Sequence, residues 1–317
     1  MNPGPRKPGG GPPRTSAPHA PPRVAAPSLS VVVASNRDRS LLEACLASLV
    51  DQCRRENAEL IVARSGLTPD ATALRRAFPS VLFVNAPDDA SIPQLRGIGM
   101  TEASGDIVAL TEDHCLAHPD WLQTLARHVG DGADVIGGGM DNAQRTRLVD
   151  WGAYFAEYGF FAPSRKSGEH ESPLLTGANV AYSRRVVEEV IALARENQWE
   201  NVAHGRLRAR GSILRFVSTA EISQNQQYSF WPFCADRYVH GRDYARKRLS
   251  EEKVNRWALL AGSPLLPFLL TWRVARAATK GRTGTFVRAL PATFAFLASW
   301  SIGEAAGYLR GPVRDRE

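Results

Sequence analysis

The stretch 109–122, ALTEDHCLAHPDWL, decides the fold, because it joins the end of one predicted strand to the start of a predicted helix. Residues 107–110 form an apolar run that predicts a short buried strand. Glu112, Asp113 and His114 follow this strand, and Pro119 stands in the first turn of the next helix. Ligands of open α/β sheets bind at the carboxyl ends of the strands, so the three polar side chains predict a ligand site.

Strands and helices alternate upstream of this stretch. Apolar runs rich in β-branched residues predict three further strands, at 29–35, 59–63 and 81–85. Helical spacing predicts the segments between them, at 40–53, 71–78 and 91–104, and Thr68-Pro69-Asp70 is expected to begin the second of these helices. Four strand-helix units in succession predict a parallel sheet with right-handed crossovers.

The pattern is less regular downstream. After a helix at 119–129, we expect a strand at 134–139, an aromatic-rich segment at 148–161, a polar loop at 162–172 and a short strand at 180–182. Ser183 is expected to cap a helix that runs to about residue 197. A last strand is expected at 213–218, at the edge of the sheet.

Composition indicates one main globular domain with an appendage, since 44% of the 317 residues are hydrophobic and 22% are charged. The net charge of +7 and the pI near 9.5 favour a polyanionic partner, which includes an anionic membrane or a phosphorylated substrate. Four scattered cysteines make a disulfide framework or a zinc ribbon unexpected and favour a reducing compartment. Residues 1–28 are rich in proline and glycine and are predicted to form a disordered basic tail, with no secretory signal.

The C-terminal region, 246–317, has a different character. Two uncharged runs, 257–272 and 289–303, are each shorter than the roughly 20 residues that a simple membrane-spanning helix needs. Arginine and lysine side chains lie between the runs, and tryptophans lie near their ends, as in segments that contact an anionic membrane surface. The alternative is that both runs form helices buried against the main domain.

The segment 228–248 combines aromatic and basic side chains. It is interpreted either as a cover over the active site that meets a lipid phosphate acceptor, or as a basic amphipathic helix that links the domain to the tail. Single-stranded nucleic acids are bound by similar combinations, but no recognised nucleic-acid module surrounds this one, so nucleic-acid binding is not expected.

The order of these parts resembles the family-two glycosyltransferases with a GT-A fold, which move sugars from nucleotide-diphosphate donors. The resemblance extends from about residue 29 to 244. It rests on SVVVASNR at 30–37, IPQLRGIG at 92–99, GDIVALTEDHCLAHPDWL at 105–122, TGAN at 176–179 and Trp199-Glu200. It implies an α/β, Rossmann-like GT-A domain at 29–245, with a mostly parallel sheet flanked by helices, and a helical, apolar, membrane-associating region at 246–317.

The resemblance also implies roles for individual residues. Those expected to bind the donor are Ser35, Asn36, Arg37, Arg96, Glu112 and Asp113. Gly177, Asn179 and Trp199 are expected on the acceptor side. Glu200 falls where the family places its catalytic carboxylate, and Glu157 is the reserve candidate for the general base.

Glu112, Asp113 and His114 stand where the family has its acidic metal motif, and we expect them to bind a divalent cation. Nitrogen ligation favours Mn²⁺ over Mg²⁺, which prefers oxygen ligands. His118 beside His114 or Cys115 leaves zinc as a weaker alternative, since further paired ligands are missing from the sequence. A second departure is Arg64, which replaces the acidic residue that the family uses to meet the nucleotide base.

The sequence therefore predicts an inverting, metal-dependent glycosyltransferase at the cytoplasmic face of the cell membrane, with a lipid or cell-envelope glycan acceptor. The alternative is a non-catalytic relative that uses the fold for binding or scaffolding at the membrane. A dinucleotide-dependent oxidoreductase is disfavoured, because 34–37 lacks the glycine-rich turn that approaches a pyrophosphate.

Overall fold

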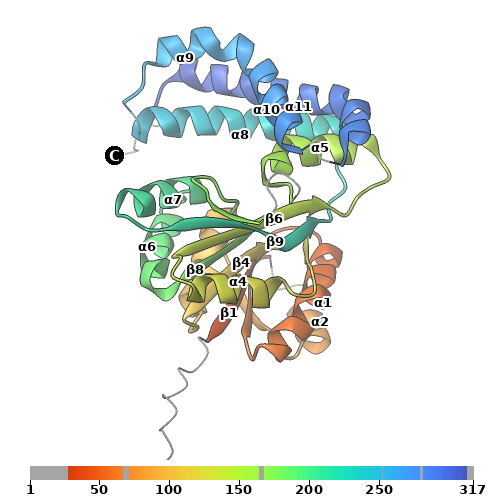
Figure 1. Ribbon diagram of the computed structural model, residues 1–317, viewed down its shortest axis with the longest axis vertical. Coiled ribbons are helices and arrows are strands. Elements are labelled where there is room, and N and C mark those ends of the chain that lie inside the picture. The colour runs from red at the N-terminus through yellow and green to blue at the C-terminus, as the bar shows by residue number, and fades with distance from the viewer. Residues whose placement is uncertain (1–27, 67–70, 164–167, 252, 279–280, 313–317) are drawn as a thin grey trace, which may run out of the picture.

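The computed structural model describes residues 28–66, 71–163, 168–251, 253–278 and 281–312. An α/β unit built on one mixed sheet forms one part of the molecule, and a layer of C-terminal helices lies over it (Figure 1). The predicted tail at 1–28 and the helix start at 68–70 lie outside the described residues, apart from Ser28.

The first half of the sheet is parallel, as predicted. Its strands are β1 (Leu29–Ser35), β2 (Glu59–Ser65), β3 (Leu82–Ala86) and β4 (Ile107–Glu112), in the spatial order β3-β2-β1-β4. The connecting helices are α1 (Arg39–Arg55), α2 (Ala71–Ala77) and α3 (Ile92–Glu102). Ala34 pairs with Glu112 in the register of β1 with β4, so the loops after these two strands lie side by side.

The second half of the sheet is mixed. Next to β4 lies β8 (Asn179–Ser183), which is antiparallel to it, and then β6 (Val135–Asn142) and β9 (Leu214–Gln224). The expectation of an edge strand at 213–218 is wrong, because β9 is longer and pairs with β6, with β5 (Cys115–Ala117) and with β7 (Glu169–Glu171). The helix at 119–129 was also expected to follow the strand at 107–110 directly, but β5 lies between them. The strand β7 lies within the segment 162–172, which was expected to be a polar loop.

Alternate residues of β1 face opposite sides of the sheet, and both sides are buried. The sequence of the strand is therefore a continuous apolar run. Val31 and Val33 belong to the core that includes residues of α1 and of α4 (Trp121–Gly130), while Val32 belongs to the core on the other face, with residues of α3 and of α6 (Arg184–Arg195). The core on that second face also receives Leu207 from α7 (Glu200–Ala209). Ser183 is the N-cap of α6 as expected, although its side chain makes no capping hydrogen bond.

The helical layer consists of α5 (Leu148–Tyr158), α8 (Phe230–Glu251), α9 (Arg256–Gly262), α10 (Leu266–Ala278) and α11 (Thr283–Arg310), with short 3-10 turns η1 (Gly159–Phe161) and η2 (Ser263–Leu265) (Figure 1). The long helix α11 packs against α8 and α5. Two helical stretches, Arg256–Ala277 and Thr283–Arg310, are long and apolar enough to cross a membrane by length and composition alone. The sequence predicted a domain boundary at residue 245, and α8 continues through this position. The boundary therefore remains a prediction.

Candidate active site

The acidic motif begins at the last residue of β4. Asp113 follows it, and its Oδ2 accepts hydrogen bonds from the Ser35 hydroxyl at 2.9 Å and from the backbone N–H groups of Asn36 at 2.9 Å and Arg37 at 2.8 Å. Burial alone would raise the pKa of Asp113, but contacts with His114 and these donors lower it. The carboxylate therefore holds the loop after β1 in place, which the side-by-side ends of β1 and β4 make possible.

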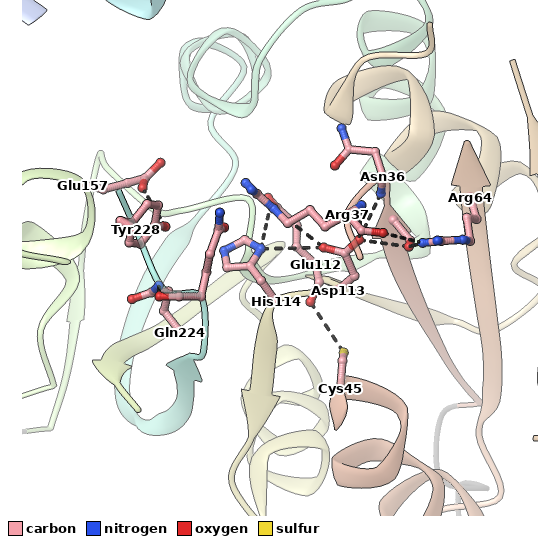
Figure 2. A network of polar contacts seen from close by, with 12 residues as sticks. Asn36, Arg37, Cys45, Arg64, Glu112, Asp113, His114, Glu157, Gln224 and Tyr228 are labelled. Carbon is pink, nitrogen blue, oxygen red and sulfur yellow. Dashed lines mark hydrogen bonds and ion pairs between the residues drawn. The ribbon is translucent and has the colours of Figure 1, made fainter. Parts of the chain in front are cut away.

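Arg64 lies on the other side of that loop, where Figure 2 shows it pointing toward Asp113 from β2. Its Nη1 donates to the Ser35 hydroxyl oxygen at 2.7 Å and to the Arg37 carbonyl oxygen at 3.0 Å. The arginine is buried. Its guanidinium group thus stabilises the loop, at the position where the resemblance led us to expect a carboxylate.

Arg96 joins the acidic motif to the proposed catalytic base. Its Nη2 lies 2.5 Å from Glu112 Oε1, and its Nη1 lies 2.8 Å from Glu200 Oε2. All three side chains are buried or nearly so, so each ion pair is only weakly screened by water. Residues from α3, β4 and α7 are thereby brought together across more than 100 positions of sequence.

Glu200 is the first residue of α7, where the helix dipole favours a negative charge. Its Oε1 accepts a hydrogen bond from the backbone N–H of Gly177 at 3.1 Å. Burial alone would raise the pKa of Glu200, but Arg96 and the Gly177 N–H lower it, so the carboxylate is ionised at neutral pH. A side chain at position 177 would collide with the Arg96 guanidinium, since a Cβ there would lie 2.2 Å from Nη1.

The two other residues expected on the acceptor side lie in different environments. Trp199 is 38% exposed, and the Arg96 guanidinium lies 5.8 Å from its ring centroid. Asn179 is fully buried in β8, where its Oδ1 accepts from the Trp121 indole and its Nδ2 donates to the carbonyls of Gly139 and Ala220. The Asn179 amide is therefore engaged entirely by the fold.

His114 is buried between the two carboxylates and α5. Its Nε2 lies 3.1 Å from the Tyr158 hydroxyl, while its Nδ1 lies 3.6 Å from Glu112 Oε2 and 3.8 Å from Asp113 Oδ1. Burial alone would lower the pKa of His114, but the neighbouring Cys115, Asp113 and Glu112 raise it to about 10. Figure 2 shows the imidazole beside both carboxylates.

The fit of this motif to a metal ion rests on two buried atoms, Asp113 Oδ1 and His114 Nδ1, which have no hydrogen-bond partner. With Glu112 Oε2 they form a set of two oxygens and one nitrogen, which suits a divalent cation that accepts mixed ligands. Within the described residues, no group of three or more His, Cys, Asp or Glu side chains is arranged as a ready metal site. The donor set would fit a divalent cation once the imidazole has lost the proton that its raised pKa retains, and no cage is preformed within the described residues.

A cleft of about 710 Å³ opens over these residues, between the α/β unit and the helical layer. Its inner wall includes Asn36, Arg37, Arg96, Glu112 and Glu200. The reserve base Glu157 also lines it from α5, where its Oε1 lies 3.7 Å from Arg237 Nη1. The cleft is thus lined by Asn36 and Arg37 of the expected donor-binding loop, by Glu112 of the acidic motif and by both candidate bases.

Several cleft residues escaped the sequence reasoning. Tyr158 stands next to Glu157 in the sequence, and only the fold brings its hydroxyl to His114. Others come from the C-terminal helices, among them Leu266, Leu270 and Arg273 of α10 and Leu297, Trp300 and Glu304 of α11. The apolar sequence around these residues predicted membrane contact, and it did not predict that they line the cleft.

Comparison with known proteins concerns the family and the fold. The family model for glycosyl transferase family 2 matches residues 30–191, which is more than half of the chain. A mannosyltransferase from Pyrobaculum calidifontis, PcManGT, solved with GDP-Man and Mn²⁺, is 15% identical in sequence, with 92% of this chain and 90% of that chain covered and a TM-score of 0.57. TarS from S. aureus is 11% identical over 87% of this chain and 90% of that chain, with a TM-score of 0.49.

A search of curated proteins finds no significant match. The structural similarity to PcManGT shows the fold alone at this level of identity, and it confirms the predicted α/β, GT-A fold class with apolar helices at the C-terminus.

Proposed function

Because the chain belongs to glycosyltransferase family 2, we propose that it transfers a sugar from a nucleotide-diphosphate donor to a lipid or cell-envelope glycan acceptor with inversion at the anomeric carbon. The observation that carries the proposal is the buried chain of ion pairs Glu112–Arg96–Glu200 in the wall of the cleft. It ties the acidic motif to a carboxylate that is ionised and able to accept a proton.

In the proposed reaction, Glu200 removes the proton from the acceptor hydroxyl as that oxygen attacks the anomeric carbon. A carboxylate has about four lone-pair sites, so the contacts with Arg96 and Gly177 leave room for one more donor. The bond from the anomeric carbon to the diphosphate breaks in the same displacement, and the attack from the opposite side inverts the configuration. Glu157 is the second candidate because it lines the same cleft.

Negative charge grows on the departing diphosphate and needs positive charge nearby. Arg37 lines the cleft, and its side chain is 34% exposed, so it is available to a phosphate oxygen. Glu112, Asp113 and His114 would hold a divalent cation, with Mn²⁺ favoured by the imidazole ligand. When bound, such an ion would neutralise charge on the diphosphate.

We also place the protein at the cytoplasmic face of the membrane, with the helical layer in contact with anionic lipid. The support is the exposed apolar surface of α10 and its neighbours, where Leu265 is 71%, Phe268 63% and Trp272 54% exposed. Arg256 and Arg276 lie over the rings of Trp257 and Trp272, a pairing suited to the lipid headgroup region.

Vesicle binding tests the lipid-contact part of this placement. Replacing Phe268 and Trp272 together by serine should greatly reduce cosedimentation with phosphatidylcholine vesicles that contain phosphatidylglycerol. Leu82→Ser is the matched control, because Leu82 is 50% exposed on β3 in the α/β unit. Equal loss of binding in both variants, or no loss in either, would contradict the placement.

Thermal unfolding with a panel of nucleotide sugars, with and without Mn²⁺, tests the donor. A donor at 100 times its Kd should add about 2.7 kcal/mol to the free energy of unfolding. The panel should include GDP-mannose, which occupies the structurally similar PcManGT. Stabilisation followed by turnover with an acceptor supports an enzyme, whereas binding without donor hydrolysis or transfer would indicate the non-catalytic alternative.

A further inference from the structure

The cleft extends beyond the reaction centre onto the helical layer. Its outer wall receives Arg237 and Arg248 from α8 and Arg273 from α10. These three guanidinium groups are additional to Arg37 and Arg96, which line the inner end of the cleft together with Glu112. The outer wall is therefore a separate cationic region on the acceptor side.

Helix α10 connects this region with the apolar surface of the molecule. Leu266, Leu270 and Arg273 are spaced by four and three residues, so they share one helical face, and all three line the cleft. Phe268 and Trp272 are exposed and absent from the cleft lining. One short helix thus presents a cation to the cleft while its exposed apolar side chains lie outside it.

The partners of the cationic side chains differ. Arg237 is 8% exposed, and it is held by Glu157 at 3.7 Å, by His240 at 2.7 Å and by the Trp300 ring at 5.1 Å. Within the described part of the chain, Arg273 has no hydrogen-bonded or ion-paired protein group. Arg273 is therefore the guanidinium best placed to bind a ligand.

The acidic groups of the outer cleft do not neutralise Arg273. Glu157 is paired with Arg237, and Glu304 accepts hydrogen bonds from the Trp300 indole at 3.2 Å and the Tyr308 hydroxyl at 2.9 Å. Asp236 is the remaining carboxylate of the lining, and it is exposed on α8. A dianionic headgroup would meet an arginine without displacing an existing ion pair.

We propose that the acceptor is a lipid whose headgroup carries a phosphate, with Arg273 binding the phosphate and the acyl or isoprenoid chain lying along the exposed apolar side of α10. This inference rests on the proposed function, because it assigns the acceptor of the same cleft. The headgroup hydroxyl that receives the sugar then faces Glu200. Guanidinium is suited to the phosphate because its fork of N–H donors matches two phosphate oxygens at once.

Calorimetric titration of the full-length chain with dodecyl phosphate, below its micelle concentration, tests the site. Dodecyl maltoside has the same chain with a neutral headgroup, and inorganic phosphate lacks the chain. We expect saturable binding of dodecyl phosphate, at least about tenfold weaker binding of inorganic phosphate and none of dodecyl maltoside. Equal affinity for inorganic phosphate would overturn the lipid part of the proposal, and equal affinity for dodecyl maltoside would overturn the phosphate part.

Arg273→Gln should weaken dodecyl phosphate binding about tenfold or more. Arg54→Gln is the control, because Arg54 lies on α1 in the α/β unit, its side chain is 74% exposed and it is absent from the cleft lining. The affinity of this control variant for dodecyl phosphate should stay within about twofold of the wild-type value. Both variants should unfold at the wild-type temperature. Equal affinities in the two variants would refute the site.

Donor binding separates this inference from the proposed function. Arg273→Gln should be stabilised by a nucleotide sugar as strongly as the wild-type chain, since Arg273 belongs to α10 and is not among the residues proposed to bind the donor. If a donor binds but dodecyl phosphate does not, only the acceptor assignment fails. If no nucleotide sugar binds, the proposed function fails, whatever the lipid result.

Discussion

Arg96 and Glu200 form a buried ion pair in which Nη1 and Oε2 lie 2.8 Å apart, and the same guanidinium holds Glu112. The arginine therefore has a structural role and an electrostatic one. It positions the proposed base in the cleft, and it keeps that base ionised in a buried environment.

The first prediction concerns the base. Glu200→Gln should lower kcat by at least about 1,000-fold, because an amide cannot take the acceptor proton. Affinity for the nucleotide sugar should stay nearly unchanged in a thermal-shift titration. Glu157→Gln is the control from the same cleft and should keep most of the activity; the reverse pattern would make Glu157 the base.

The pH dependence of transfer follows from the lowered pKa of Glu200. The base must be ionised, so activity is retained as the pH falls through the usual glutamate range and is lost only below it. The acid limb of kcat against pH should therefore lie below the ordinary glutamate pKa. An acid limb at or above that value would contradict the role of Arg96.

The second prediction is that Arg96→Leu destabilises the fold by about 3–5 kcal/mol, because it leaves two buried carboxylates without their shared cation. Urea unfolding at neutral pH measures this loss. Arg54→Leu removes a guanidinium from an exposed pair with Asp51, whose side chains are 74% and 68% exposed, and should cost less than about 1 kcal/mol. Similar losses in the two variants would mean that the buried pair contributes little.

The sequence predicted the parallel half of the sheet because fully buried strands read as continuous apolar runs. It failed at β5 and β7, which have three residues each, since such short strands carry no periodic pattern. The predicted site residues Arg96, Glu112 and Glu200 do meet in the structure. Their mutual ion pairing had no sequence signal, because it depends on how α3 and α7 are placed together on one face of the sheet.

The contribution of α10 was hidden for a different reason. Arg273 follows an apolar run that predicts membrane contact, and that composition does not reveal which side of the helix faces the cleft. The side is set by the packing of α10 against the next helix, α11, and against η1, which lies far upstream in the sequence. Only the folded chain therefore shows that the apolar C-terminal region lines the cleft of the proposed active site.

The third prediction concerns the packing of α8 on α11. A Cβ at Gly303 would lie 2.1 Å from the Tyr238 carbonyl oxygen, so only glycine allows the two backbones to approach. Gly303→Ala should therefore lower stability by about 1–3 kcal/mol. Gly284→Ala, in the first turn of the same helix with open space around it, should be neutral or raise stability by up to about 1 kcal/mol.

Thermal unfolding of the two glycine variants, under one set of buffer and lipid conditions, gives the comparison. The opposite signs are the informative result, because alanine is the better helix former at both positions. A stabilising Gly303→Ala would show that α8 and α11 do not depend on direct backbone contact.

The fourth prediction concerns His204 of α7, which lies one turn after Glu200. Its Nε2 lies 2.9 Å from the Tyr182 hydroxyl, and the side chain is 1% exposed. Burial lowers the pKa of His204 from 6.5 to about 4, with Glu200 opposing the shift and Arg96 adding to it. The folded state therefore keeps the imidazole neutral in a range where the unfolded chain binds a proton.

The sign of the effect on stability follows from this difference in proton binding. Between pH 6.5 and about 4 the unfolded state holds more protons, so the free energy of unfolding falls as the pH is lowered through that window. The full shift corresponds to a loss on the order of 3 kcal/mol. His204→Phe should remove this part of the pH dependence, although it costs stability at every pH by leaving the Tyr182 hydroxyl without its partner. Tyr182→Phe should retain the dependence, because burial is its main cause, and equal slopes in the two variants by urea unfolding would assign the effect to another group.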